Sequence, residues 1–120
     1  MKVVLLGCGF HGRGIGYQLA AAEGVELSVL DLDGARAEAV GEKAGVPSGT
    51  ADVTDPEGLR EALAGAGLVV NAVGPYHRTA LGVVEAALDT GAHYVDMNDD
   101  HEVAEALLLD PASLYRSVVA

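Results

Sequence analysis

The chain has 120 residues, half of them hydrophobic, which is enough to bury the core of one domain and too few for two. Its 18 acidic residues against 7 lysines and arginines give a formal net charge of −11, which repels polyanions and argues against nucleic-acid binding. No apolar run reaches the roughly 18 residues of a membrane-spanning helix, and the first apolar run meets glycine too early for a signal peptide. We expect a soluble, cytoplasmic protein, and a single cysteine, Cys8, fits that reducing compartment.

The first half of the chain alternates short Val- and Leu-rich runs with longer segments of helical period, a pattern typical of strands and helices that build a parallel sheet. We expect a strand over 2–6 and a helix over about 11–22 that ends before Gly24, which suits a C-terminal cap. The next elements are a strand, a helix and a short strand, at 26–30, 35–43 and 46–51.

The second half continues the same alternation. Thr54 is expected to cap a helix that starts at Asp55 and Pro56, because proline in the first helical position loses no hydrogen bond. The following elements are a strand, a helix stopped by Gly91, another strand and a last helix, at 67–72, 79–90, 93–96 and 102–109.

Five strands joined by helices predict an α/β fold, a doubly wound parallel sheet of the Rossmann type with strand order 3-2-1-4-5 and the fifth strand at its edge. We interpret residues 1–109 as one domain and 110–120 as a short C-terminal tail or helix. The usual sixth strand is missing from this reading.

Three glycines, Gly7, Gly9 and Gly12, form G-x-G-x-x-G between the first strand and the first helix. In a dinucleotide-binding turn the first glycine permits the tight turn, the second lets the backbone approach a pyrophosphate, and the third lets helix and strand pack closely. The helix start offers free N–H groups to phosphates. The predicted cofactor site therefore begins with this turn, including Phe10 and His11.

Asp31 ends the second strand, at about the spacing expected for a carboxylate that binds the adenosine ribose. Such a carboxylate repels a 2′-phosphate, and the next residue is Leu32 rather than an arginine, so we predict that NAD is preferred over NADP. Arg13 or Arg36 could instead swing toward that phosphate, or both could be solvated helix residues.

Cys8 and the histidines are explained without a redox or metal-binding role. Cys8 stands where a helix dipole could lower a thiol pKa and make a redox sensor, but the turn needs only a small side chain. The histidines and acids of the chain show no spacing typical of metal ligands, so no metal is predicted.

The loop after the fourth strand reads NAVGPYH and should lie beyond the carboxyl end of that strand, where ligands of such sheets bind. We expect it to contact the nicotinamide half of the cofactor, and its predicted site residues are Asn71, Ala72, Val73, Gly74 and Pro75. Tyr76 and His77 follow at the mouth of the crevice. No catalytic residue is identified, and His77 is the side chain there that could shuttle protons.

Three stretches together, LLGCGFHGRGIGYQLA, VVNAVGPYHRTALGVVEAALDTGAHYVDMNDD and the acid at Asp31, resemble the N-terminal cofactor-binding domain of the saccharopine dehydrogenase and reductase family, which includes lysine 6-dehydrogenase-like enzymes. The matching pattern is the glycine turn, a V-N-x-x-G-P-[FY] loop and a G-x-H-Y-[VI]-D strand. The residues that carry the match are Gly7, Gly9, Gly12, Asn71, Gly74, Pro75, Tyr76, Gly91, His93, Tyr94, Val95 and Asp96.

The resemblance implies a nicotinamide-dependent oxidoreductase that acts on a C–N bond of an amino acid or related compound. It also implies a large substrate domain, so this chain would take a small amino-acid-like substrate only if a second domain or a partner supplied the rest of the cleft. Members of the family often use NADP, which contrasts with the NAD preference predicted from Asp31. We therefore interpret the chain as the NAD(P)-binding part of an incomplete enzyme.

Two other interpretations stay open. A stand-alone module could bind NAD(H) and report its redox state through homo-oligomer contacts along the fifth strand. Alternatively, LLGCGFHG could be the glycine motif of a methyltransferase that binds S-adenosylmethionine, although Leu5 and Leu6 stand where that motif usually has an acid.

Overall fold

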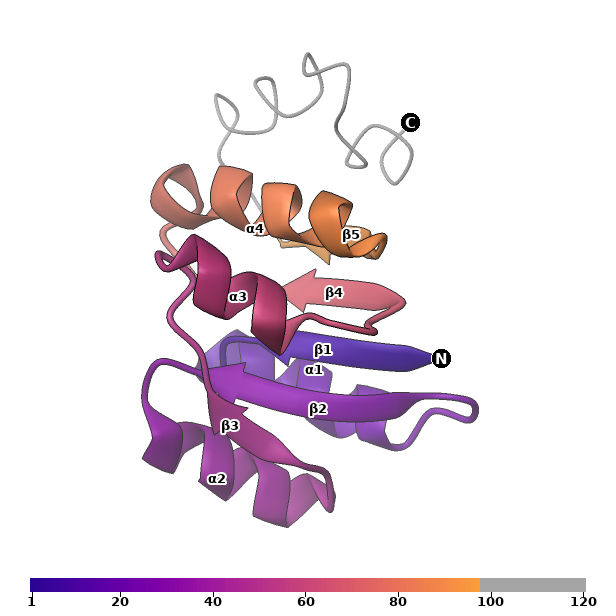
Figure 1. Cartoon of the computed structure of the whole chain (residues 1–120). Coiled ribbons are helices and arrows are strands. Elements are labelled where there is room, and N and C mark those ends of the chain that lie inside the picture. The colour runs from indigo at the N-terminus through magenta and orange to yellow at the C-terminus, as the bar shows by residue number, and fades with distance from the viewer. Residues whose placement is uncertain (98–120) are drawn as a thin grey trace.

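The computed structural model describes residues 1–97 and consists of a parallel sheet with helices on both faces (Figure 1). Five strands lie in the order β3-β2-β1-β4-β5, as predicted. The strands are β1 (Lys2–Leu6), β2 (Glu26–Asp31), β3 (Ser48–Thr50), β4 (Leu68–Asn71) and β5 (His93–Asp96). The helices are α1 (Phe10–Ala20), α2 (Gly34–Ala44), α3 (Pro56–Ala62) and α4 (Tyr76–Thr90). The expected helix at 102–109 and the tail at 110–120 lie outside the described residues.

The hydrophobic core consists of two layers, one on each face of the sheet. Val4, Leu6 and Val69 pack with α3 and α4, whereas Val3 and Leu5 pack toward α1 and α2. Figure 1 shows α3 and α4 on one face of the sheet and α1 on the other. Alternate residues of a strand point to opposite faces, so a strand covered on both sides must be apolar throughout. Each buried Val or Leu contributes about 1.5–3 kcal/mol, and this explains the continuous apolar run of β1.

The first helix is shorter at its C-terminus than the sequence predicted. It ends at Ala20 with Ala21 as its C-cap, and Gly24 instead has φ +76° in the turn that leads to β2. The predicted cap at Gly24 is therefore wrong, although Gly91 ends α4 in the left-handed conformation as expected. β2 ends at Asp31, as predicted for this carboxylate and one residue beyond the expected range 26–30, and Asp31 pairs with Thr50 of β3.

Two helix starts also differ from the prediction. Asp55 is the N-cap of α3, while the Thr54 hydroxyl donates a hydrogen bond to Asp52, so Thr54 is not the cap. α4 begins at Tyr76, three residues before the predicted start. Pro75 is its N-cap, with φ −77°, and the Tyr76 ring packs against the core.

The described part of the chain contains no helix long and apolar enough to cross a membrane.

Candidate functional site

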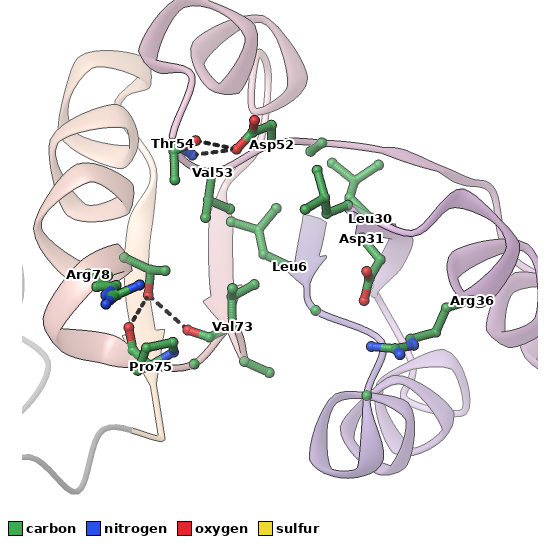
Figure 2. A pocket seen from close by; sticks show the side chains of 17 residues that line it. Leu6, Leu30, Asp31, Arg36, Asp52, Val53, Thr54, Val73, Pro75 and Arg78 are labelled. Carbon is green, nitrogen blue, oxygen red and sulfur yellow. Dashed lines mark hydrogen bonds between the residues drawn. The ribbon is translucent and has the colours of Figure 1, made fainter.

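A pocket of about 450 Å³ opens at the carboxyl ends of the central strands (Figure 2). Its floor is the glycine turn between β1 and α1, and one wall comes from Leu30, Asp31 and Leu32 at the end of β2 with Arg36 of α2. The other wall comes from residues 72–75 after β4 and from Arg78 and Thr79 of α4. Residues 51–54, which follow β3, close the far end. The pocket lies where the order of strands reverses on either side of β1, the position at which doubly wound sheets bind ligands.

Two of the three glycines are required by the packing of the turn. Gly7 has φ +96°, and a Cβ there would lie 2.8 Å from the carbonyl oxygen of Ala72. A Cβ on Gly12 would lie 1.8 Å from the carbonyl oxygen of Gly7, which no side chain could accommodate. The predicted structural roles of Gly7 and Gly12 are thus confirmed.

Gly9 differs from the other two glycines because a Cβ there would meet no atom of residues 1–97 within 4 Å. Gly9 lines the pocket and is also the N-cap of α1, without a side-chain cap or an acidic residue in the first turn. The first hydrogen bond of the helix runs from the Arg13 N–H to the Gly9 carbonyl at 2.9 Å. The N–H groups of the first helical residues, before Arg13, therefore have no partner within the helix, and the positive end of the helix dipole adjoins the pocket floor.

Asp31 joins the glycine turn to the end of β2. Its Oδ2 accepts a hydrogen bond from the Cys8 N–H at 2.8 Å, and its Oδ1 accepts one from the Asp33 N–H at 2.8 Å. Arg36 lies on the same wall of the pocket (Figure 2). The wall thus presents a carboxylate whose position is fixed by the backbone and a guanidinium on the adjacent helix.

The wall formed by residues 72–75 is supported from behind by buried polar groups. The Asn71 side-chain Oδ1 accepts a hydrogen bond from the Val73 N–H at 3.0 Å, and its Nδ2 donates to the Tyr94 hydroxyl at 3.1 Å. The Thr79 hydroxyl donates to the Val73 carbonyl at 2.8 Å. Both backbone groups of Val73 are therefore held by side chains.

Residues 51–54 form a wall that the sequence prediction missed. The Asp52 carboxylate accepts hydrogen bonds from the Thr54 hydroxyl and N–H, which lower the pKa of Asp52, and Val53 lies beside them (Figure 2). The rule that ligands lie beyond the carboxyl ends of strands applies equally to the third strand and could have identified this turn. Arg78 was missed for a different reason, since the predicted helix began only at Thr79.

The predicted site residues separate into two groups. Those that line the pocket are Gly7, Gly9, Asp31, Ala72, Val73, Gly74 and Pro75. Those that do not are Phe10, His11, Gly12, Asn71 and the proton-shuttle candidate His77.

The residues outside the pocket have identifiable surroundings. The Phe10 side chain is 76% exposed, and its ring contacts the ring of His11 and the guanidinium of Arg13. His77 lies on the exposed side of the first turn of α4. Tyr76 was expected at the mouth of the crevice, but its ring packs against the core and its hydroxyl donates to the Asn71 carbonyl at 3.4 Å.

Cys8 behaves as a small core residue. It is 2% exposed, and its thiol donates to the Leu30 carbonyl at 3.7 Å. Burial and, to a lesser extent, the Asp31 carboxylate raise the pKa of Cys8 to about 11, while Arg36 opposes the shift. The thiol is therefore protonated at neutral pH, which disfavours a redox-sensor role. Within residues 1–97 no group of histidine, cysteine or acidic side chains could hold a metal ion.

The fold and the pocket define a Rossmann-type domain for a dinucleotide cofactor. The chain belongs to the saccharopine dehydrogenase family: residues 3–114 match the family model described as the saccharopine dehydrogenase NADP binding domain. The motifs predicted this family, and over these residues the chain is similar to the cofactor-binding domain of saccharopine dehydrogenase-like proteins.

Individual relatives agree with this assignment. A probable mitochondrial saccharopine dehydrogenase-like oxidoreductase of Arabidopsis thaliana is 36% identical over 58 residues, which cover 48% of this chain and 13% of that protein. Apo saccharopine dehydrogenase (L-Glu forming) of Saccharomyces cerevisiae superposes with a TM-score of 0.78 and 28% identity over 88% of this chain and 23% of that one. The chain thus spans less than a quarter of the length of either relative.

A more distant structure shares the fold alone. The triphenylmethane reductase of Citrobacter sp., solved in complex with NADP(H), superposes with a TM-score of 0.65 at 22% identity, over 98% of this chain and 43% of that one.

Proposed function

We propose that the pocket binds a nicotinamide dinucleotide whose pyrophosphate lies over Gly7 and Gly9. The observation that carries this proposal is the open space at Gly9, on the pocket floor and at the N-terminus of α1, which has no acidic residue in its first turn. Backbone N–H groups and the helix dipole favour an anion there, and without a Cβ the phosphates can approach the backbone. The adenosine then extends between Asp31 and residues 51–54.

We further propose that this domain prefers NAD over NADP because of Asp31. Two backbone N–H groups hold the carboxylate in place, so it cannot turn away from a 2′-phosphate without leaving both donors unpaired. NADP is the second candidate, and two observations favour it: Arg36 lines the same wall, and the matching family model is that of an NADP-binding domain. The choice of cofactor therefore depends on whether Asp31 or Arg36 dominates the charge at that wall.

We infer that the complete protein is an oxidoreductase that acts on a C–N bond of an amino acid or a related compound. The family of the chain and the names of its relatives support this class of reaction. The nicotinamide supplies the hydride chemistry when bound, and the residues of this domain bind and orient it. The substrate would be bound by a second domain or partner. If the chain is instead a stand-alone module that senses NAD(H), we expect the same cofactor binding without catalytic turnover.

The test of the proposed function is a set of parallel calorimetric titrations with NAD, NADH, NADP, NADPH and S-adenosylmethionine. Saturable binding of at least one nicotinamide dinucleotide, with no binding of S-adenosylmethionine, is the expected result. Binding of S-adenosylmethionine alone would contradict the proposal and favour a methyltransferase. Binding of neither class would show that the pocket does not serve a cofactor.

A further inference from the structure

A chain of buried hydrogen bonds connects the end of β5 to the wall of the cofactor pocket. The Tyr94 hydroxyl donates to Asp96 Oδ2 at 2.6 Å and accepts from Asn71 Nδ2 at 3.1 Å. Asn71 Oδ1 in turn accepts from the Val73 N–H at 3.0 Å. The side chains of Tyr94 and Asn71 are fully buried, so water cannot replace these bonds.

The direction of every bond in this chain is fixed. A tyrosine hydroxyl has one proton, and a carboxylate can only accept, so the proton of Tyr94 points to Asp96 and its oxygen accepts from the Asn71 amide. Burial raises the pKa of Tyr94 far above the physiological range, so the hydroxyl keeps this proton. The amide nitrogen of Asn71 must then face Tyr94, which directs its oxygen to the Val73 N–H.

Within residues 1–97, these hydrogen bonds reach the lining of the pocket at Val73. Neither Asn71 nor Tyr94 lines the pocket, whereas Val73 and its neighbours Ala72, Gly74 and Pro75 do. The Thr79 hydroxyl holds the Val73 carbonyl from α4, and Asn71 holds the Val73 N–H from β4. Without Asn71 in its present orientation, one of these two supports would be lost.

We propose that Tyr94 and Asn71 are positioning residues for the cofactor: together with Asp96 they hold the wall at residues 72–75 in the conformation that accepts the dinucleotide. This inference rests on the proposed cofactor function and adds to it. It gives the G-x-H-Y-[VI]-D stretch a positioning role, although its tyrosine and aspartate do not line the pocket. It also means that the carboxyl end of β5, at Asp96, is coupled to the affinity for the cofactor.

The first test compares two tyrosine variants by titration with NAD and NADP at neutral pH. Tyr94→Phe removes the hydroxyl and keeps the ring, so we expect it to fold and to bind the preferred cofactor about tenfold more weakly. Tyr17→Phe is the matched control, because Tyr17 lies on α1 against Lys43 and does not line the pocket. It should bind with unchanged affinity. Thermal unfolding of each variant shows how much of the protein is folded.

The second test uses Asn71→Asp, whose pH profile separates positioning from mere packing. A carboxylate at position 71 can still accept the hydrogen bond of the Val73 N–H, but it cannot donate one to the Tyr94 hydroxyl. The carboxylates at positions 71 and 96 would then both have only the one Tyr94 proton to accept. Among the described residues, Tyr76 of α4 is a further titratable group that acts on Tyr94. Two carboxylates that share one site raise the pKa of one of them. The affinity of Asn71→Asp for the cofactor should therefore recover as the pH falls, when that carboxyl gains a proton and donates again.

The outcomes distinguish this inference from the proposed function. If the unmodified chain binds no dinucleotide, the proposed function fails and this inference fails with it. If the unmodified chain and Tyr17→Phe bind, and folded Tyr94→Phe binds equally well, only the positioning role is overturned. If Tyr94→Phe does not fold, the pH dependence of cofactor affinity in Asn71→Asp decides. Affinity that recovers at low pH supports the positioning role, and a pH dependence parallel to that of the unmodified chain overturns it.

Discussion

The carboxylate of Asp31 accepts a hydrogen bond from the backbone N–H of Cys8 at 2.8 Å, and this bond connects the end of β2 to the glycine turn. A residue predicted to bind a ribose thus also fixes the turn predicted to bind the pyrophosphate. The two halves of the proposed site are therefore not independent, and substitutions of Asp31 should change both stability and cofactor choice.

The first prediction separates these two tasks of Asp31. Asp31→Asn removes the charge but keeps an acceptor for one of the two N–H groups, so the ratio of NADP to NAD affinity should rise about tenfold, which corresponds to about 1.4 kcal/mol. Asp31→Ala should change that ratio similarly and also lower the free energy of unfolding by about 2 kcal/mol, because both donors lose their partner. Titration and urea denaturation measure the two effects. An unchanged ratio in both variants would show that Asp31 does not face the ribose.

The second prediction concerns Arg36. Arg36→Ala should weaken NADP binding by about tenfold and leave NAD binding nearly unchanged, because a guanidinium at that wall can pair with a 2′-phosphate and NAD carries none. Arg13→Ala is the control, since Arg13 packs on Phe10 and does not line the pocket. Equal losses for NAD and NADP in Arg36→Ala would refute a selective role.

The third prediction uses two glycines of α1. Gly12→Ala should lower the free energy of unfolding by about 3 kcal/mol or prevent folding, because its Cβ would overlap the Gly7 carbonyl. Gly14→Ala should instead stabilise the protein by about 0.5–1 kcal/mol, since a Cβ there meets nothing and alanine favours the helix. Chemical denaturation of both variants tests the pair. Similar stabilities for the two would contradict the close packing of α1 against the turn.

The fourth prediction follows from the raised pKa of Cys8. Its value of about 11 in the folded chain exceeds the ordinary value of 9.0, so the folded state holds the thiol proton more tightly than the unfolded state does. The corresponding stabilisation is fully present below pH 9 and is lost as the pH rises toward 11. Unfolding measured across this range should show a steeper loss of stability for the unmodified chain than for Cys8→Ala. Parallel curves would mean that the thiol titrates normally.

Much of the fold follows from local signals. The continuous apolar run of β1 and the spacing of Gly7, Gly9 and Gly12 are consecutive in the sequence, and the right-handed crossover rule then leaves few strand orders. Helix ends were less predictable. α4 begins early, at Tyr76, whose ring packs against the core. That packing depends on residues distant in the sequence.

The site was predicted in part, for physical reasons. The turns after β1 and β4 carry glycine signals, whereas the turn after β3 has no such signal, and its Thr54 was interpreted as a helix cap. The inward direction of Asn71 could have been predicted, because strand alternation places it on the same face as the buried Val69. Its bond to Tyr94 could not, since it depends on the register of β4 and β5. The predicted NAD preference, cytoplasmic location and oligomeric state stay predictions.

Calorimetric titration of the unmodified chain and of Gly9→Val with NAD and NADP tests directly whether the glycine turn binds the pyrophosphate of a dinucleotide. The backbone at Gly9 is extended, with φ −77°, and a Cβ there meets no described protein atom within 4 Å, so we expect the variant to fold, but its side chain would occupy the space assigned to the pyrophosphate. Gly14→Val, on the exposed part of the same helix, is the control. We expect binding by the unmodified chain and by Gly14→Val, with none detectable for a folded Gly9→Val. Equal affinity in all three would contradict a pyrophosphate site at this turn.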